Sequence, residues 1–211
     1  SLSAWVWAFA AQPHGVQLIH HNVFFTENPH AEFGPIGQGR MPEAPTLYIC
    51  AQDRAEGAPQ DRMERFEIIM NAPSGIAPYA DEEAQCRTRT FSRLKDFGLT
   101  FSPDPAPGSL TTPAALAKRY PGSQGAIYGR SPEGLMAAFQ RPQARTALLG
   151  LYLAGGGAHP GAGVPMAALS AKHAAEAIMQ DRISASKSAP TAMPGGTSMA
   201  SHRMGPARSR S

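Results

Sequence analysis

The stretch LYLAGGGAHPGAGVPMAALSAKHAAE, residues 151–176, decides how this chain is interpreted. The apolar run over 147–154 is typical of a strand buried on both faces, and it leads through a glycine-rich turn into a helix predicted over 164–181. Glycines at such a turn let backbone N–H groups approach a ligand, because no Cβ stands in the way. The helix N-terminus adds free donors and a partial positive charge. The segment predicts a site for an anionic or electron-rich group; the alternative is a tight turn that binds nothing.

Familiar nucleotide-binding motifs do not account for this turn. Gly155 and Gly157 are followed by Pro160 where a G-x-G-x-x-G fingerprint needs its third glycine, and no Gly-Lys-Ser/Thr follows. The turn is therefore neither a dinucleotide fingerprint nor a P-loop.

The rest of the chain mixes strands and helices. Further strands are predicted over 16–25, 46–51, 65–71 and 99–102, and helices over 81–97 and 113–120; 29–45 is expected to be an irregular connection. Trp5, Trp7 and Phe9 alternate with smaller residues, as in a core strand or in the wall of a long apolar channel. The pattern is α/β or mixed α+β. It lacks the regular alternation of a self-sufficient doubly wound sheet, so we expect the 147–154 strand to find its partner strands outside this chain.

Composition and charge narrow the class of protein. The 211 residues are 42% hydrophobic, enough for a sizeable core, and no run approaches the ~18 apolar residues of a membrane-spanning helix. No secretory signal opens the chain. The sequence pI of about 9.1 would suit a nucleic-acid binder. However, residues 181–211 carry a net charge of +4 and residues 1–180 one of −1. We therefore expect no nucleic-acid partner and a disordered tail over 183–211.

Cysteine and histidine give little sign of a metal. Cys50 and Cys86 form no CxxC or zinc-ligand spacing and are expected to be reduced thiols. His20, His21 and His30 could suggest a metal site, but adjacent residues of a strand point to opposite faces, so none is predicted.

The 151–176 motif resembles the C-terminal signature of the bacterial-type carotenoid desaturases, the phytoene desaturase family of flavoproteins. The resemblance includes TPAALAKRYPGSQGAIYG at 112–129 and AFQRPQAR at 138–145. HHNVFF at 20–25, PTLYICAQDR at 45–54 and MNAP at 70–73 are similar to one branch, the hydroxyneurosporene and methoxyneurosporene desaturases. The match covers about residues 1–182.

This resemblance implies a particular domain organisation. The family enzymes are at least about twice as long and begin with a βαβ unit whose G-x-G-x-x-G holds the FAD pyrophosphate. That unit is absent from these residues, and the chain begins at Ser1 rather than Met. We therefore expect a C-terminal portion, cut before Ser1, of a two-domain Rossmann-like FAD/NAD(P)-binding flavoprotein. Residues 1–125 would be a partial substrate-binding domain, 126–182 the FAD-contacting segment and 183–211 the tail.

The resemblance also implies a site and an activity. The positions expected to contact FAD are Gly156, Gly157, Ala158, His159, Gly163, Val164, Pro165 and Met166. The reaction is desaturation of an acyclic hydroxylated or methoxylated carotenoid, by a protein attached peripherally to the cytoplasmic side of the membrane; these residues alone are expected to be inactive. The catalytic residue is not identified. The alternatives are a non-catalytic carotenoid- or lipid-binding fragment, or another oxidoreductase or isomerase of the same fold.

Three side chains near the motif have two interpretations each. His159 could transfer a proton beside the flavin, or it could shape the turn and hydrogen-bond to cofactor or backbone. Arg141 and Arg145 could contact a cofactor or hold the fold together.

Overall fold

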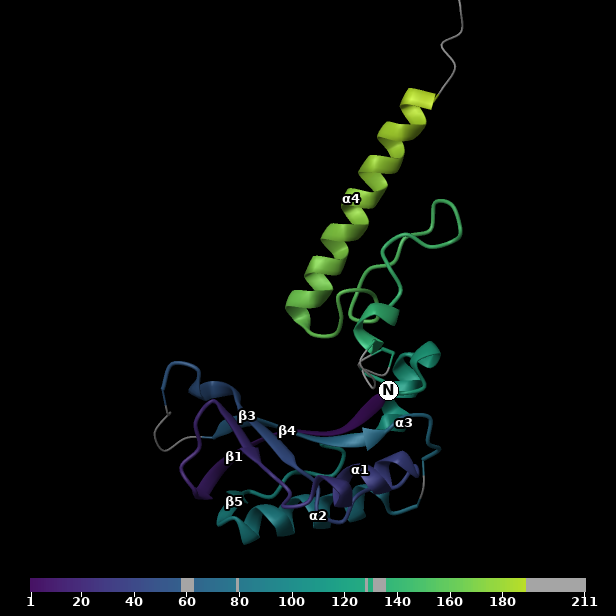
Figure 1. Ribbon diagram of the computed structural model, residues 1–211. Helices are drawn as coiled ribbons and strands as arrows, with labels where there is room; N and C mark the ends of the chain where they lie inside the picture. Colours follow the sequence, from purple (N-terminus) through teal and green to yellow (C-terminus); the bar gives the residue numbers. More distant parts are fainter. Residues whose placement is uncertain (58–62, 79, 128, 131–135, 189–211) are drawn as a thin grey trace, which may run out of the picture.

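A computed structural model describes residues 1–57, 63–78, 80–127, 129–130 and 136–188. It has two visibly different parts (Figure 1). One is an antiparallel sheet with helices on one of its faces. The other is a set of loops that leads into a long helix, which projects away from the sheet.

The sheet has the strand order β2-β3-β4-β1-β5, with β6 also paired to β1, and every pairing is antiparallel. The strands are β1 (Leu2–Gly15), β2 (His21–Phe24), β3 (Leu47–Ala51), β4 (Glu64–Pro73), β5 (Leu99–Ser102) and β6 (Leu110–Thr111). An antiparallel sheet with separate helices fits the α+β form of the prediction.

β1 pairs with three strands, β4, β5 and β6, and it carries two large core side chains. Trp5 and Trp7 are fully buried, as a core strand requires. Their indole nitrogens donate to Glu82 Oε1 at 2.8 Å and to Thr90 Oγ1 at 3.2 Å. Both tryptophans therefore lie in the core rather than along an open channel.

The helix face of the sheet is covered by α1 (Pro29–Gly37) and α2 (Glu82–Asp96) (Figure 1). The Phe91 ring of α2 packs edge-on against Trp7 with their centroids 5.4 Å apart. α2 ends before Gly98, whose φ of +79° is unfavourable for other residues. α2 and β3, β4 and β5 are close to the predicted elements.

The remaining helices are α3 (Pro113–Arg119) and α4 (Val164–Ser188), with short 3₁₀ turns η1 (Gln52–Arg54), η2 (Pro121–Ser123) and η3 (Ala137–Gln140). Thr112 caps α3 by accepting a hydrogen bond from the Ala115 N–H at 3.2 Å, which confirms the predicted start.

The chain between β1 and β3 differs from the prediction. The connection expected to be irregular over 29–45 contains α1, because Asn28 accepts from the His30 N–H at 3.0 Å and Pro29 suits the first helical position. The predicted strand over 16–25 shortens to β2, because Asn22 accepts from the Ile19 N–H and donates to the Ile19 carbonyl, which bends the chain before the strand.

The predicted buried strand over 147–154 does not form. Leu148 is 68% exposed and Leu149 fully exposed, and the segment makes a single bridge, between Arg145 and Tyr152. No strand of the described residues lies beside it, so nothing removes these side chains from water.

The predicted tail is also partly wrong. α4 continues to Ser188, seven residues beyond the predicted helix end at 181, so the first part of the tail expected over 183–211 is helical. Residues 189–211 lie outside the described residues.

Candidate functional site: a glycine-rich turn before α4

The predicted site residues lie in one turn and at the start of α4. Three of its glycines, Gly155, Gly161 and Gly163, have φ values of +118°, +155° and +102°. Residues with a Cβ rarely adopt such angles, so the backbone itself requires glycine at these positions. The turn is therefore built to a specific shape rather than merely flexible.

Ser170 fastens this turn to α4. Its Oγ accepts a hydrogen bond from the Gly155 N–H at 2.7 Å and lies 2.7 Å from the Ala167 carbonyl, and the side chain is almost fully buried. The hydroxyl thereby satisfies the amide at which the turn begins. The sequence pattern gave no sign of this role, because the partner lies fifteen residues away across a turn of unknown shape.

Arg141 braces the turn from the other side. Its Nη1 donates to the Gly156 carbonyl at 3.0 Å, and its side chain is mostly buried. A Cβ added at Gly161 would lie 3.7 Å from the Arg141 Nε, and one added at Gly129 only 2.9 Å from the Gly157 Cα. Of the two roles considered for Arg141, its contacts here are those of a residue that holds the fold.

Arg145 holds the fold in the same way, but on the surface. It donates to Asp181 at 3.0 Å and 3.1 Å, and the Tyr152 hydroxyl donates to the same carboxylate at 2.7 Å. The guanidinium of Arg145, followed by the Tyr152 hydroxyl, lowers the pKa of Asp181, and the hydrogen bond to Asp181 raises the pKa of Tyr152. This cluster attaches the loop to the second half of α4.

His159 lies between the turn and a groove along α4. Its N–H donates to the Pro142 carbonyl at 2.8 Å, which is the turn-shaping contact considered above. Its ring stacks on that of His173, with centroids 6.2 Å apart. The His159 Nδ1 is buried and has no hydrogen-bond partner within the described part of the chain. A groove of about 490 Å³ adjoins both rings and is lined by Gln143, Ala144, Arg145, His159, His173, Glu176, Ala177 and Gln180.

The remaining predicted residues offer backbone rather than side chains. Ala158 is buried, whereas Val164, Pro165 and Met166 are exposed at the start of α4. The first α-helical hydrogen bond runs from the Ala167 N–H to the Gly163 carbonyl at 2.9 Å, so the N–H groups of Val164 and Met166 precede that ladder. A Cβ added at Gly157 or Gly163 would meet nothing within 4 Å. The turn thus has an open backbone face next to a positive helix end, which suits an electron-rich planar group or an anion.

The histidines near β2 depart from their expected geometry. A ring nitrogen of His20, a ring nitrogen of His21 and the Cys50 sulfur lie within 4.8 Å of one another. Strand alternation does not separate the two rings, because His20 precedes β2 and only His21 belongs to the strand. His30 lies in α1 and is not part of the group.

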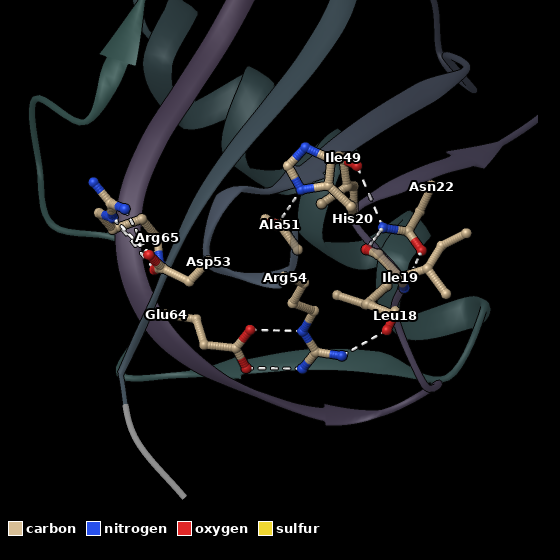
Figure 2. A network of polar contacts seen from close by, with 10 residues as sticks. All are labelled: Leu18, Ile19, His20, Asn22, Ile49, Ala51, Asp53, Arg54, Glu64 and Arg65. Atoms are coloured by element: carbon tan, nitrogen blue, oxygen red, sulfur yellow. Dashed lines mark hydrogen bonds and ion pairs between the residues drawn. The ribbon is translucent and has the colours of Figure 1, made fainter. Parts of the chain in front are cut away.

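A polar network beside this group is structural (Figure 2). Arg54 donates to Glu64 through Nε at 2.6 Å and Nη2 at 2.8 Å, and to the Leu18 carbonyl at 2.6 Å. The Arg54–Glu64 pair joins η1 to the start of β4 and holds the bend before β2 in place.

Comparison with known proteins agrees with the motifs. The chain matches no protein-family model. It is 68% identical over 187 residues to a hydroxyneurosporene desaturase of Rhodobacter capsulatus, and 62% identical over 187 residues to one of Cereibacter sphaeroides; each match covers 89% of this chain and 38% of the relative. A 4,4'-diapolycopene oxygenase of Methylomonas sp is 29% identical over 173 residues, covering 78% of this chain and 35% of the relative. The chain is therefore homologous to the hydroxyneurosporene desaturases, and it spans about two fifths of the length of the curated relatives that it matches.

Proposed function

We propose that this chain forms part of an FAD-dependent carotenoid desaturase, which removes two hydrogens from an acyclic hydroxylated or methoxylated carotenoid. The observation that carries the proposal is the 68% identity over 187 residues to a protein named for desaturating hydroxyneurosporene. The whole enzyme would be a two-domain Rossmann-like flavoprotein, with residues 1–125 in its substrate-binding domain and 126–182 along its flavin.

The glycine-rich turn fits a flavin. Its glycines leave an open backbone face, and the start of α4 directs a partial positive charge toward that face. Bound FAD would supply the hydride-accepting chemistry, and reduced flavin carries negative charge that a helix N-terminus stabilises. We propose that the backbone from Gly156 to His159 and from Gly163 to Met166 holds and orients the ring.

The His159 Nδ1 is a further polar atom that could contact a bound flavin. This atom is buried without a partner within the described residues, and burial without a hydrogen bond is costly. A turn of the His159 ring toward the open face of the glycine-rich turn would let Nδ1 hydrogen-bond to the cofactor and would remove that cost. In this proposal His159 positions the flavin through a hydrogen bond and is not assigned the proton transfer.

The carotenoid substrate bears on where the protein works. No helix among the described residues is long and apolar enough to cross a bilayer. We propose peripheral attachment on the cytoplasmic side of the membrane, because the substrate is a membrane lipid.

A chimera tests the proposed activity. Residues 1–182 would replace the matching segment of the R. capsulatus relative, and the purified chimera would be given a 1-hydroxylated neurosporene. We expect a product with two fewer hydrogens and absorption at longer wavelength. A chimera that folds and binds flavin but does not desaturate would contradict the proposal, and incorporation of oxygen instead would favour the activity named in the Methylomonas relative.

Two glycine variants in that chimera test the site. Gly163→Val places a β-branched residue at a φ of +102° and fills the open face, so we expect flavin content to fall at least about tenfold. Gly34→Ala is the control, because Gly34 lies in α1 with open space around it. Equal flavin content in both would remove the turn from the site.

Binding measurements on the 211-residue chain alone distinguish a portion of a flavoenzyme from a non-catalytic carotenoid-binding module. We expect weak, sub-stoichiometric FAD binding, because residues 1–211 hold no G-x-G-x-x-G unit for the pyrophosphate. Tight carotenoid binding without flavin would favour the non-catalytic alternative.

A further inference from the structure

Two histidines and a cysteine meet at the outer edge of the sheet, far along the chain from the glycine-rich turn. One ring nitrogen from each of His20 and His21 and the Cys50 sulfur lie within 4.8 Å of one another. Imidazole nitrogen and thiolate sulfur are ligands that zinc takes from proteins, with bonds of about 2.0 to 2.3 Å. Tetrahedral zinc holds such atoms about 3.3 to 3.8 Å apart, so side-chain rotation on binding would draw these three atoms together around one ion.

Backbone pairing brings the three residues together. His21 and Cys50 are directly opposite in the antiparallel β2–β3 pair, so their side chains leave the same face of the sheet. His20 lies just before the strand, and its carbonyl accepts a hydrogen bond from the Ala51 N–H at 2.9 Å. This bond brings His20 to the end of β3, next to Cys50.

Both histidines make a hydrogen bond through Nδ1, which leaves Nε2 available to a metal. The His20 Nδ1 lies 3.0 Å from the Ala51 carbonyl (Figure 2). A carbonyl only accepts, so Nδ1 carries the proton and Nε2 keeps its lone pair. The His21 Nδ1 lies 2.8 Å from the Tyr48 hydroxyl, whose oxygen can accept the Nδ1 proton in the same way. A histidine held by a second hydrogen bond is fixed in ring orientation and tautomer, as metal-binding histidines usually are.

We propose that His20, His21 and Cys50 form a zinc site, with water or an exogenous ligand in the fourth position. The donor set of two nitrogens and a sulfur favours zinc over Mg²⁺ or Ca²⁺, which prefer oxygen. His21 is exposed and the other two residues are half-buried, so an ion can enter from solvent. Binding displaces the thiol proton of Cys50 and ties the bend before β2 to β3.

Cys86 is the other free cysteine among the described residues, and it lies outside this group. Cys86 lies in the core beneath the sheet, where burial raises the pKa of its thiol to about 12. In the part of the chain that the structure describes, Cys86 belongs to no group of three or more potential metal ligands. It therefore provides a matched control within the same chain.

Metal titration of the full 211-residue chain tests the site without flavin or carotenoid, so its outcome is independent of the proposed activity. We expect Co²⁺, used as a spectroscopic substitute, to give a thiolate-to-cobalt charge-transfer band that saturates at one equivalent and is removed by Zn²⁺. Cys50→Ser should abolish the band, and Cys50→Ser and His21→Gln should each weaken Zn²⁺ binding at least about tenfold. Zn²⁺ should also raise the melting temperature of the unsubstituted chain.

Two controls separate this site from incidental binding. Cys86→Ala should keep the band, and His173→Gln should keep the Zn²⁺ affinity, because His173 lies on α4, where its ring stacks on that of His159 in the glycine-rich turn. Tyr48→Phe should weaken binding about tenfold yet keep the band, since it removes the hydroxyl beside His21 and Cys50 and leaves all three ligands in place. Absence of Zn²⁺ binding at micromolar concentration, or equal affinity and an unchanged band in Cys50→Ser, would overturn the proposal.

Discussion

The sheet and the α4 region differ in how far their apolar side chains are buried. In the sheet, Trp5 and Trp7 are fully buried between strands and α2. Around α4, Leu149 is fully exposed and Val164 is 85% exposed. The sheet region closes its own core, whereas the α4 region is held mainly by polar contacts and leaves an apolar surface open. Large exposed apolar surfaces usually mark contact with something else, which agrees with a chain that spans two fifths of its relatives.

This contrast bears on how the glycine-rich turn keeps its shape. Within the described residues, the hydrophobic core cluster lies in the sheet region and includes no residue of the glycine-rich turn, so polar contacts determine the shape of the turn. Ser170 and Arg141 supply them, each bonding to a backbone group of the turn. Apolar burial therefore stabilises the sheet, whereas hydrogen bonds to backbone groups fix the geometry of the turn.

The largest expected effect comes from the sheet core. Trp7→Ala removes a fully buried ring that contacts Phe91 and Thr90, so we expect a loss of about 4 kcal/mol in the free energy of unfolding. Leu149→Ala should change it by less than about 0.5 kcal/mol, because Leu149 is fully exposed. Urea unfolding measures both. A comparable loss in the two variants would mean that the two regions do not differ as described.

A smaller effect is expected from the buried ion pair of the sheet. Arg54 and Glu64 are 10% and 3% exposed, so Arg54→Met leaves a buried carboxylate without its partner and should cost about 3 kcal/mol. Arg65→Met is the matched control: the Arg65 side chain is 68% exposed, so losing its pair with Asp53 should cost far less. Urea unfolding again gives the values, and equal costs would show that burial does not decide the strength of these pairs.

In the α4 region the corresponding test is Ser170→Ala. The substitution leaves the Gly155 N–H without its partner, and we expect local opening of the turn to become easier by about 1.5 kcal/mol. Hydrogen exchange at the Gly155 amide measures this opening directly. Ser92→Ala, at an exposed position of α2, should leave that exchange rate unchanged. If Gly155 exchanges no faster in Ser170→Ala, the serine does not hold the turn.

The sequence predicted elements whose signals are local, and missed what depends on neighbours. Thr112 and Gly98 mark the ends of α3 and α2 because capping needs only adjacent residues. The 147–154 strand failed because a buried strand is defined by partner strands, which the described residues do not provide. α1 was missed because Gly34 and Pro35 outweighed the cap at Asn28.

In the candidate site, too, features set by a single position could be predicted from sequence, and contacts between distant residues could not. The glycines of the turn could be found from sequence, because positive φ angles select glycine at the position itself. The contact of Ser170 with Gly155, and that of His159 with His173, required the shape of the turn. The grouping of His20 with His21 was missed because the start of β2 was placed too early, which made strand alternation seem to apply to both.

The smallest expected effect is the pH dependence of the Asp181 cluster. Arg145 and Tyr152 lower the pKa of Asp181 below its ordinary 3.8, so the folded state favours the ionised carboxylate. Its stabilising contribution is therefore fully present above about pH 4 and is lost as the pH falls through the lowered folded-state pKa. Asp181→Asn should thus melt α4 more easily at pH 7, and the difference from the unsubstituted chain should close in acid below about pH 4. Thermal melts followed by far-UV circular dichroism measure the gap.

Tyr152→Phe provides the internal control for that measurement. It removes one of the two groups that lower the Asp181 pKa and keeps Arg145, so its gap should be smaller than that of Asp181→Asn and close over the same pH range. A gap that widens as the pH falls would mean that the carboxylate is not stabilised in its ionised form. Such a result would also mean that the Asp181 cluster does not attach the 145–152 loop to α4. The Ser170 hydroxyl would then be the contact that joins the turn to the helix.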